Sequence, residues 1–184
     1  NLSKDISEEI IWLTNIVENI LNMTRINDSQ LILHEENEVI DDIVSDAVFH
    51  MEKLFGEHNI NVSLPKEIVY LPMDGKLISQ VIVNLLDNAI KHTASDTSIS
   101  LTVTTDKENA IFSIADNGSG LNASIKDNIF DNFVTTDLEI TDRKRGIGLG
   151  LSICKAIVEA HGGKIFATDN MPSGTIFTFF RLEF

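Results

Sequence analysis

The feature that most constrains the fold is a helical segment, residues 80–93, that is apolar on nearly every side. Its apolar positions and those just before it are Leu77, Ile78, Val81, Ile82, Leu85, Leu86, Ala89 and Ile90. One polar stripe interrupts them, formed by Gln80, Asn84, Asn88 and Lys91, and this spacing places the four side chains above one another on a helix. Asparagine is a poor helix former, and its amide is costly to bury without a partner. The stripe therefore predicts a core helix whose polar face binds a ligand, although a core amide bonded to nearby backbone is the alternative for one asparagine alone.

Two glycine-rich loops follow this segment. DNGSG occupies 116–120 after a predicted strand, and RGIGLG occupies 145–150 before a predicted helix. Glycines allow a ligand to approach the backbone closely, and the N–H groups at the start of a helix bind phosphate. The basic run Arg-Lys-Arg at 143–145 stands beside the second loop, with a solvated basic turn as the alternative. Together the loops predict a nucleotide ligand, whereas DNGSG alone is compatible with a surface turn.

Five motifs stand in a fixed order along the chain: NLLDNAIKHT at 84–93, DNGSG at 116–120, IFDNF at 129–133, RGIGLGLSI at 145–153 and PSGT at 172–175. In this order they resemble the N, G1, F, G2 and G3 boxes of the ATP-binding domain of sensor histidine kinases, which belongs to the GHKL superfamily. Residues 72–93 and 153–165 look like the branch of potassium-responsive Kdp sensor kinases. The resemblance extends from about residue 40 to residue 184.

The resemblance implies an α+β fold, a two-layer α/β sandwich of the Bergerat type with helices on one face of a mixed sheet, preceded by one long amphipathic helix. Residues 1–28 are expected to be the second helix of a dimerisation and phosphotransfer hairpin, and residues 29–184 the catalytic ATP-binding domain. A heptad seam in the first stretch agrees with a bundle helix, and a helix folded back on the domain surface is the alternative. Hydrophobic periodicity predicts helices at 40–55, 74–92 and 150–160, and strands at 31–39, 61–64, 68–70, 99–105, 110–116, 164–168 and 175–182.

The resemblance also assigns roles within the expected pocket for ATP and Mg²⁺. Asn88 is the expected metal ligand, Asn84 supports the metal or its waters, and Lys91 reaches a phosphate. Asp116 is expected to accept a hydrogen bond from the adenine amine. The other residues expected to contact the nucleotide are His92, Gly118, Gly120, Leu121, Phe130, Arg145, Gly146, Gly148, Leu149, Gly150 and Thr175.

Residues 121–144 are expected to form a lid anchored by Phe130 and Phe133. Many members of the family carry an aromatic residue and an arginine just after the second phenylalanine of this box. Val134 and Thr135 stand there instead, so a cation of the lid has to come from residues 143–145.

The expected activity is that of a protein-histidine kinase, which transfers the γ-phosphoryl group of Mg·ATP to a histidine for relay to the receiver domain of a response regulator. None of the five histidines lies in the family's phosphoacceptor setting. We therefore expect the helix that bears the acceptor histidine to be missing from this chain, and the chain to be inactive alone. The alternatives are a GHKL-type ATPase and an ATP-sensing module without kinase activity. The ATPases usually carry a glutamate one turn before the metal asparagine, where this chain has Asn84.

Composition narrows the partners. A formal net charge of −14 disfavours nucleic acid and anionic lipid as partners. The single cysteine, Cys154, excludes an internal disulfide and a cysteine-based zinc site. No membrane span or signal peptide is apparent, and no direct membrane contact is expected of this stretch. The expectation is a cytoplasmic fragment of a membrane-anchored bacterial sensor kinase.

Overall fold

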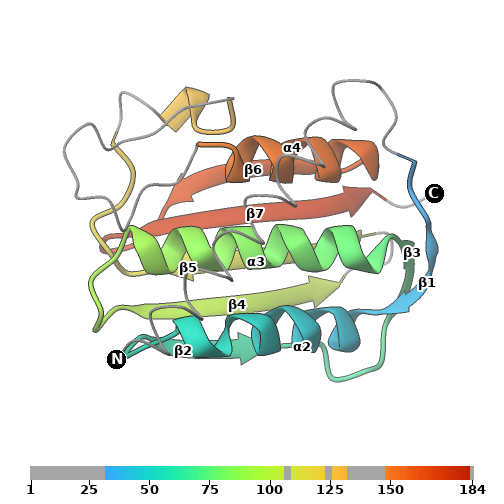
Figure 1. Cartoon of the computed structure of the whole chain (residues 1–184), viewed down its shortest axis with the longest axis horizontal. Coiled ribbons are helices and arrows are strands. Elements are labelled where there is room, and N and C mark those ends of the chain that lie inside the picture. Colours follow the sequence, from blue (N-terminus) through green and yellow to red (C-terminus); the bar gives the residue numbers. More distant parts are fainter. Residues whose placement is uncertain (1–31, 106–108, 123–125, 132–147, 183–184) are drawn as a thin grey trace, which may run out of the picture. The chain divides into compact units, whose positions relative to one another are not determined.

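Three helices cover one face of a five-stranded sheet in the computed structural model of the chain (Figure 1). The helices are α2 (Ile40–Met51), α3 (Gly75–Lys91) and α4 (Gly150–Ala160). The strand order is β2 (Asn59–Ser63), β4 (Ser98–Thr105), β5 (Asn109–Asp116), β7 (Thr175–Leu182) and β6 (Lys164–Asp169). β2 and β4 pair in parallel and the other neighbours are antiparallel, so the sheet is mixed and the predicted α+β sandwich is confirmed.

The structure describes residues 32–105, 109–122, 126–131 and 148–182, which from Leu33 onward belong to one compact unit. The helix expected within residues 1–28, and the boundary expected after it, lie outside the described residues.

A second, two-stranded sheet was not predicted as a separate element. β1 (Glu36–Val39) pairs antiparallel with β3 (Tyr70–Met73), with Glu36 opposite Met73. The strand expected over 31–39 therefore begins only at Glu36, and the strand expected over 68–70 lies at 70–73. Pro72 falls inside β3, where a two-stranded sheet tolerates the missing N–H group better than a central strand does.

The core lies between α3 and the sheet. Residues of β4, β5 and β7 alternate between buried and half-buried, so every second side chain points toward the helices. The rings of Phe112 and Phe179 stack at a centroid distance of 4.7 Å. The helix side contributes Ile78, Val81, Ile82, Leu85, Leu86 and Ala89, all buried. Full burial of one such aliphatic side chain stabilises the fold by about 1.5–3 kcal/mol.

Helix α3 begins where the sequence predicts, at the N-cap Asp74. The Asp74 carboxylate oxygen Oδ1 accepts a hydrogen bond from Leu77 N at 3.2 Å, which satisfies one of the free N–H groups of the first turn. Asp74 N in turn donates to Nε2 of His161 at 3.1 Å, and Nδ1 of His161 lies 2.8 Å from Ile157 O. His161, the C-cap residue of α4, thus ties the end of α4 to the start of α3.

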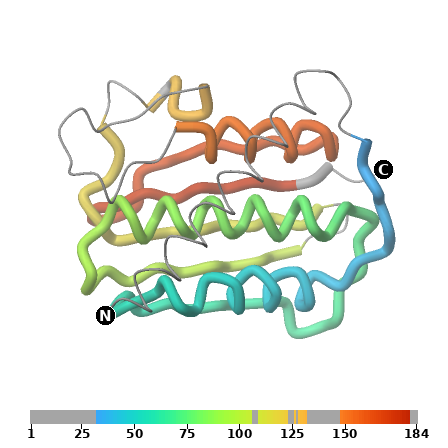
Figure 2. Tube along the Cα trace, in the orientation of Figure 1, coloured from blue at the N-terminus to red at the C-terminus, as the bar shows by residue number. Residues whose placement is uncertain are grey.

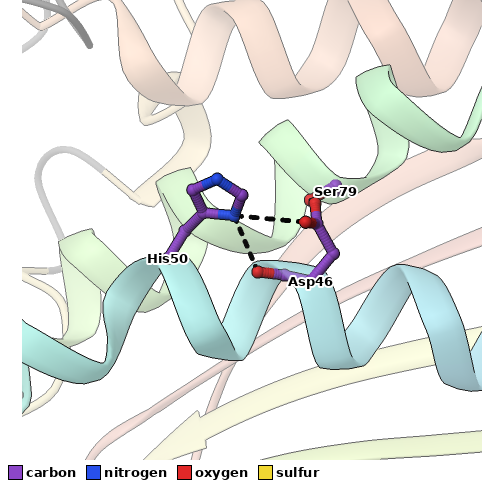
Figure 3. Close-up of polar contacts among 3 residues, drawn as sticks. All are labelled: Asp46, His50 and Ser79. Atoms are coloured by element: carbon purple, nitrogen blue, oxygen red, sulfur yellow. Dashed lines mark hydrogen bonds and ion pairs between the residues drawn. The ribbon is translucent and has the colours of Figure 1, made fainter.

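Helix α3 lies between α2 and α4, as the tube in Figure 2 shows. On the α2 side, the buried Ser79 donates its hydroxyl to Oδ2 of Asp46 at 2.9 Å (Figure 3). Nδ1 of His50 lies 3.4 Å from Oδ1 of the same carboxylate. The serine hydroxyl donates to Asp46 and not to His50, so this trio lacks the order of a serine-hydrolase relay and serves to join two helices.

Candidate nucleotide-binding site

Asp116 ends β5 and is a buried carboxylate, 5% exposed. Its Oδ1 accepts two hydrogen bonds, from Gly118 N at 2.8 Å and from Thr175 N at 3.3 Å. Within the described part of the chain, both hydrogen bonds to this carboxylate go to Oδ1. One N–H group belongs to the loop after β5 and the other to the first residue of β7, so two segments far apart in the sequence hold Oδ1 in place.

Burial and these contacts change the pKa of the Asp116 carboxyl in opposite directions. Burial raises the pKa of the Asp116 carboxyl above its ordinary value, because water no longer solvates the charge. The N–H groups of Gly118 and Thr175 oppose the rise, and His92 adds a smaller favourable charge interaction. Of these opposing effects on the pKa of this carboxyl, that of burial is the larger.

The glycine loops meet at backbone distance. At Gly118, a Cβ atom would lie 2.7 Å from the Cγ2 atom of Thr93 at the end of α3. At Gly120, which has φ of +80°, it would lie 3.2 Å from the carbonyl oxygen of Gly174. Gly174 itself has φ of +116°, and a side chain there would clash with the carbonyl oxygen of Asp116. The end of α3, the 116–120 loop and the 170–175 turn therefore form one cluster that larger residues would push apart.

The two asparagines of the polar stripe lie one turn apart on the same face of α3. Asn84 and Asn88 are half-buried. Nδ2 of Asn84 is buried and, among the described residues, makes no hydrogen bond of standard geometry. Burial raises the pKa of the Cys154 thiol to about 12, and a weak interaction with Asn84 limits the rise. Asn84 therefore adjoins α4.

Lys91 and His92 end α3. Nζ of Lys91 donates to Oδ2 of Asp87, one turn earlier, at 2.6 Å, so a phosphate has to compete with this carboxylate for the ammonium group. His92 is the C-cap, and its N–H group donates to Asn88 O at 3.1 Å.

A cavity of about 480 Å³ adjoins this cluster. Its lining residues are His92, Thr93, Ala94, Asp96, Thr97, Asn117, Gly118 and Ser119. Only His92 and Gly118 were expected at the site. Thr93, Asn117 and Ser119 lie within the two motifs, and Ala94, Asp96 and Thr97 follow the first motif, so position in or next to a motif is the signal that indicates them. Asp116 and Asn88 are not in its lining, although Asn117 and Gly118, which follow Asp116 directly, are.

The base of the expected lid rests on the sheet. Phe130 is half-buried, and its ring meets that of Phe177 edge-on at 6.3 Å. Lys126, at the start of the short helix η2 (Lys126–Asn128), donates to Asp169 Oδ2 at 2.7 Å. Ile129 is buried. The described part of the expected lid, residues 126–131, is thus fixed to β6 and β7.

The remaining expected site residues are only partly described. Leu121 is half-buried after the first glycine loop, and Leu149 is the buried N-cap residue of α4. Gly148 has φ of +71°, and Gly150 has open space where a side chain would stand. Arg145, Gly146, Phe133 and the rest of 132–147 lie outside the described residues.

The oxygen and nitrogen donors of the described residues suit a metal ion whose ligands are mostly water molecules and phosphate oxygens. The described residues hold no group of three or more histidine, cysteine, aspartate or glutamate side chains that could bind an ion. Mg²⁺ bound to a triphosphate needs only one or two protein oxygens, and the amide of Asn88 can supply one without adding charge.

In the described ranges, no helix has the length and apolar character to cross a bilayer.

A buried carboxylate, close-packed glycine loops and an asparagine-bearing helix on a mixed sheet define a nucleotide-binding α/β sandwich. Residues 73–184 match the family model described as histidine kinase-, DNA gyrase B-, and HSP90-like ATPase, and the chain belongs to this family. The family predicted from the motifs is confirmed: this is an ATP-binding domain of the sensor-histidine-kinase type.

Sensor protein KdpD of Clostridium acetobutylicum is 43% identical over 178 residues, covering 97% of this chain and 20% of that protein. KdpD of Escherichia coli K12 is 33% identical over 175 residues, covering 95% of this chain and 19% of that protein. The catalytic domain of histidine kinase ThkA superposes with a TM-score of 0.70 at 28% identity, covering 83% of this chain and 97% of that one. The chain thus spans about a fifth of the length of these KdpD relatives.

Proposed function

We propose that this chain binds Mg·ATP and, in its parent protein, transfers the γ-phosphoryl group to a histidine on a helical hairpin. The phosphohistidine then supplies the receiver domain of a response regulator. The relatives named as sensor proteins support this proposal, as does ThkA, which has been solved in complex with the response regulator TrrA. The observation that carries the proposal is the buried Asp116, held by two N–H groups beside the asparagine-bearing end of α3.

Each proposed role follows from the chemistry of the side chain. Asp116 accepts a hydrogen bond from the adenine amine, which guanine lacks. Asn88 binds Mg²⁺ through its amide oxygen, with Asn84 one turn earlier in support. Lys91 leaves Asp87 to contact a phosphate as a point charge. The bound ion neutralises phosphate charge, and the protein contributes positioning.

The second glycine loop completes the proposed pocket. Arg145 and the N–H groups of Gly146, Gly148, Leu149 and Gly150, at the start of α4, approach the phosphates. Leu121, Phe130 and Thr175 enclose the base, together with His92, Gly118 and Gly120.

A kinase fits the site better than an ATPase of the same superfamily. The position one turn before Asn88 carries the neutral amide of Asn84, which is a poor general base for activating water. We place the chain on the cytoplasmic side of a membrane-anchored bacterial sensor kinase, with residues 1–28 as part of its dimerisation hairpin.

Calorimetric titration with ATP and GTP, with and without Mg²⁺, tests the pocket. We expect ATP to bind in preference to GTP, and the gain in affinity on adding Mg²⁺ to disappear in Asn88→Ala. Loss of a hydrogen bond or ligand to a charged group corresponds to roughly a 10- to 100-fold lower affinity. Asn61→Ala on β2, outside the site, is the matched control. Equal binding of ATP and GTP, or a Mg²⁺ effect that survives in Asn88→Ala, would contradict the assignments.

Phosphotransfer separates the three candidate functions. A longer chain that includes the histidine-bearing helix should form acid-labile, base-stable phosphate from γ-labelled ATP, and Asn88→Ala should not. Steady release of phosphate without a phosphorylated protein would indicate an ATPase, and binding without either product would indicate a sensing module.

A further inference from the structure

The turn between β6 and β7 is fastened by one side chain, that of Asn170. Nδ2 of Asn170 donates to the main-chain oxygen of Asp116 at 2.7 Å. Oδ1 of the same side chain accepts from Met171 N at 2.9 Å, and Asn170 N donates to Gly174 O at 2.9 Å. Asn170 therefore closes the turn and at the same time attaches it to the end of β5.

The bond to Asp116 takes over where the strand pairing stops. The last paired residues of β5 and β7 are Ala115 and Ile176, so the carbonyl of Asp116 lies one residue beyond the ladder. Asp116 is buried, and a buried carbonyl without a partner is costly. The Asn170 amide supplies the partner that the main chain of β7 does not.

The same turn carries one of the two N–H groups that orient the Asp116 carboxylate. Thr175 N, directly after the turn, donates to Oδ1 at 3.3 Å, whereas Gly118 N donates to the same atom at 2.8 Å. The Thr175 contact is the longer and therefore the more easily lost. Gly174 packs so closely on the Asp116 carbonyl that a small displacement of the turn changes the position of Thr175 N.

We propose that Asn170 is a positioning residue for adenine recognition. By holding the turn on β5, it keeps Thr175 N on Oδ1 of Asp116, and Oδ2 is thereby presented to the adenine amine. Asn170 acts through Asp116 and does not contact the nucleotide. This inference rests on the proposed function, in which Asp116 reads adenine.

Titrations with ATP and ITP test this role, because the two bases differ only along the edge that faces Asp116: adenine has a 6-amino group and an acceptor at N1, whereas hypoxanthine has a 6-oxo group and an N–H at N1. In Asn170→Asp, the carboxylate can still accept from Met171 N but cannot donate to Asp116 O. We expect the preference for ATP over ITP to fall roughly 3- to 10-fold, the range expected for one hydrogen bond, with the affinity for ITP nearly unchanged. Asn61→Asp on β2 is the control for the added charge.

Asn170→Ser provides an uncharged second variant if the aspartate prevents folding, since serine is too short to reach Asp116 O. Loss of the ATP preference in either folded variant supports the proposal. An unchanged preference, or an equal loss of ATP and ITP affinity, would show that Asn170 only stabilises the turn. If the unsubstituted chain binds ATP and ITP equally, Asp116 does not read adenine and the proposed function fails first.

Discussion

At the scale of single residues, the recognition role proposed for Asp116 comes at a cost in stability. Its carboxylate is buried, and burial raises its pKa, so the folded chain favours the neutral form more than an unfolded chain does. A raised pKa in the folded state means that the contribution of this group to stability is largest at low pH. That contribution is lost as the pH rises through the raised pKa. At neutral pH the ionised carboxylate therefore costs stability, which the N–H groups of Gly118 and Thr175 offset only in part.

Asp116→Asn should separate the two effects. The amide oxygen can still accept from Gly118 N and Thr175 N, and no charge is buried. We expect the nucleotide-free variant to be more stable than the original chain at pH 7, by an amount that disappears as the pH falls through the raised pKa of Asp116. ATP affinity should fall roughly 10- to 100-fold, as for a lost hydrogen bond to a charged group. Denaturant titrations from pH 3 to pH 8 and calorimetry measure both; a destabilised variant at pH 7 would contradict this account.

At the scale of elements, the turn from α4 into β6 depends on close packing. A side chain at Gly163 would clash with the carbonyl oxygen of Phe180 on β7 and come within 3.0 Å of Val158 on α4. By contrast, Gly150 at the start of α4 has open space around the corresponding position. Packing therefore requires glycine at position 163, whereas it leaves room for a side chain at position 150.

Gly163→Ala should lower the free energy of unfolding by about 1–3 kcal/mol, the usual cost of overpacking. Gly150→Ala should leave it unchanged or raise it by up to about 1 kcal/mol, because alanine restricts the unfolded chain more than glycine does. Urea titration of both variants without nucleotide gives the comparison. Equal destabilisation by both alanines would be inconsistent with the packing described for Gly163.

At the scale of the whole molecule, charge is the dominant feature. A net charge of −14 on 184 residues makes the folded state repel itself. The ion pairs Lys91–Asp87 and Lys126–Asp169 are partly exposed, and such pairs contribute little. Screening should therefore stabilise the chain more by relieving repulsion than it destabilises these pairs.

Raising NaCl from about 10 mM to about 150 mM shortens the Debye length from about 30 Å to about 8 Å. We expect Tm at neutral pH to rise by about 2–4 °C, which corresponds to about 1 kcal/mol in a chain of this size. The exposed Glu57→Gln should raise Tm at low salt and have little effect at high salt. A Tm that does not respond to salt would show that the negative charges are too far apart to matter.

Much of the fold follows from periodicity. The 150–160 helix and the 175–182 strand were predicted with the bounds that the structure gives them, and the helix predicted at 74–92 matches α3 to within one residue at each end. The two-stranded sheet of β1 and β3 was not, because pairing partners far apart in sequence leave no local signal. The burial of His161 between two helix ends was missed for the same reason.

The candidate site was predictable in its motifs and not in its connections. Asp116 and Gly118 were expected together because both lie in one loop. The hydrogen bond from Asn170 to Asp116 O joins residues 54 positions apart, and neither residue type nor spacing indicates it. The ion pair between Lys91 and Asp87 could have been predicted from their i,i+4 spacing on one helix, whereas only a phosphate contact was expected of Lys91.

The hydrogen bond between His161 and Asp74 has a consequence at the opposite end of both helices. Because the end of α4 meets the start of α3, the two helices run antiparallel across the sheet (Figure 1). The end of α3 and the start of α4 therefore face the same side. Aligned peptide dipoles give a helix partial negative charge at its C-terminus and partial positive charge at its N-terminus, each about half an elementary charge. The backbone alone thus presents a pair of opposite poles, one suited to a cation and the other to an anion, before any side chain contributes.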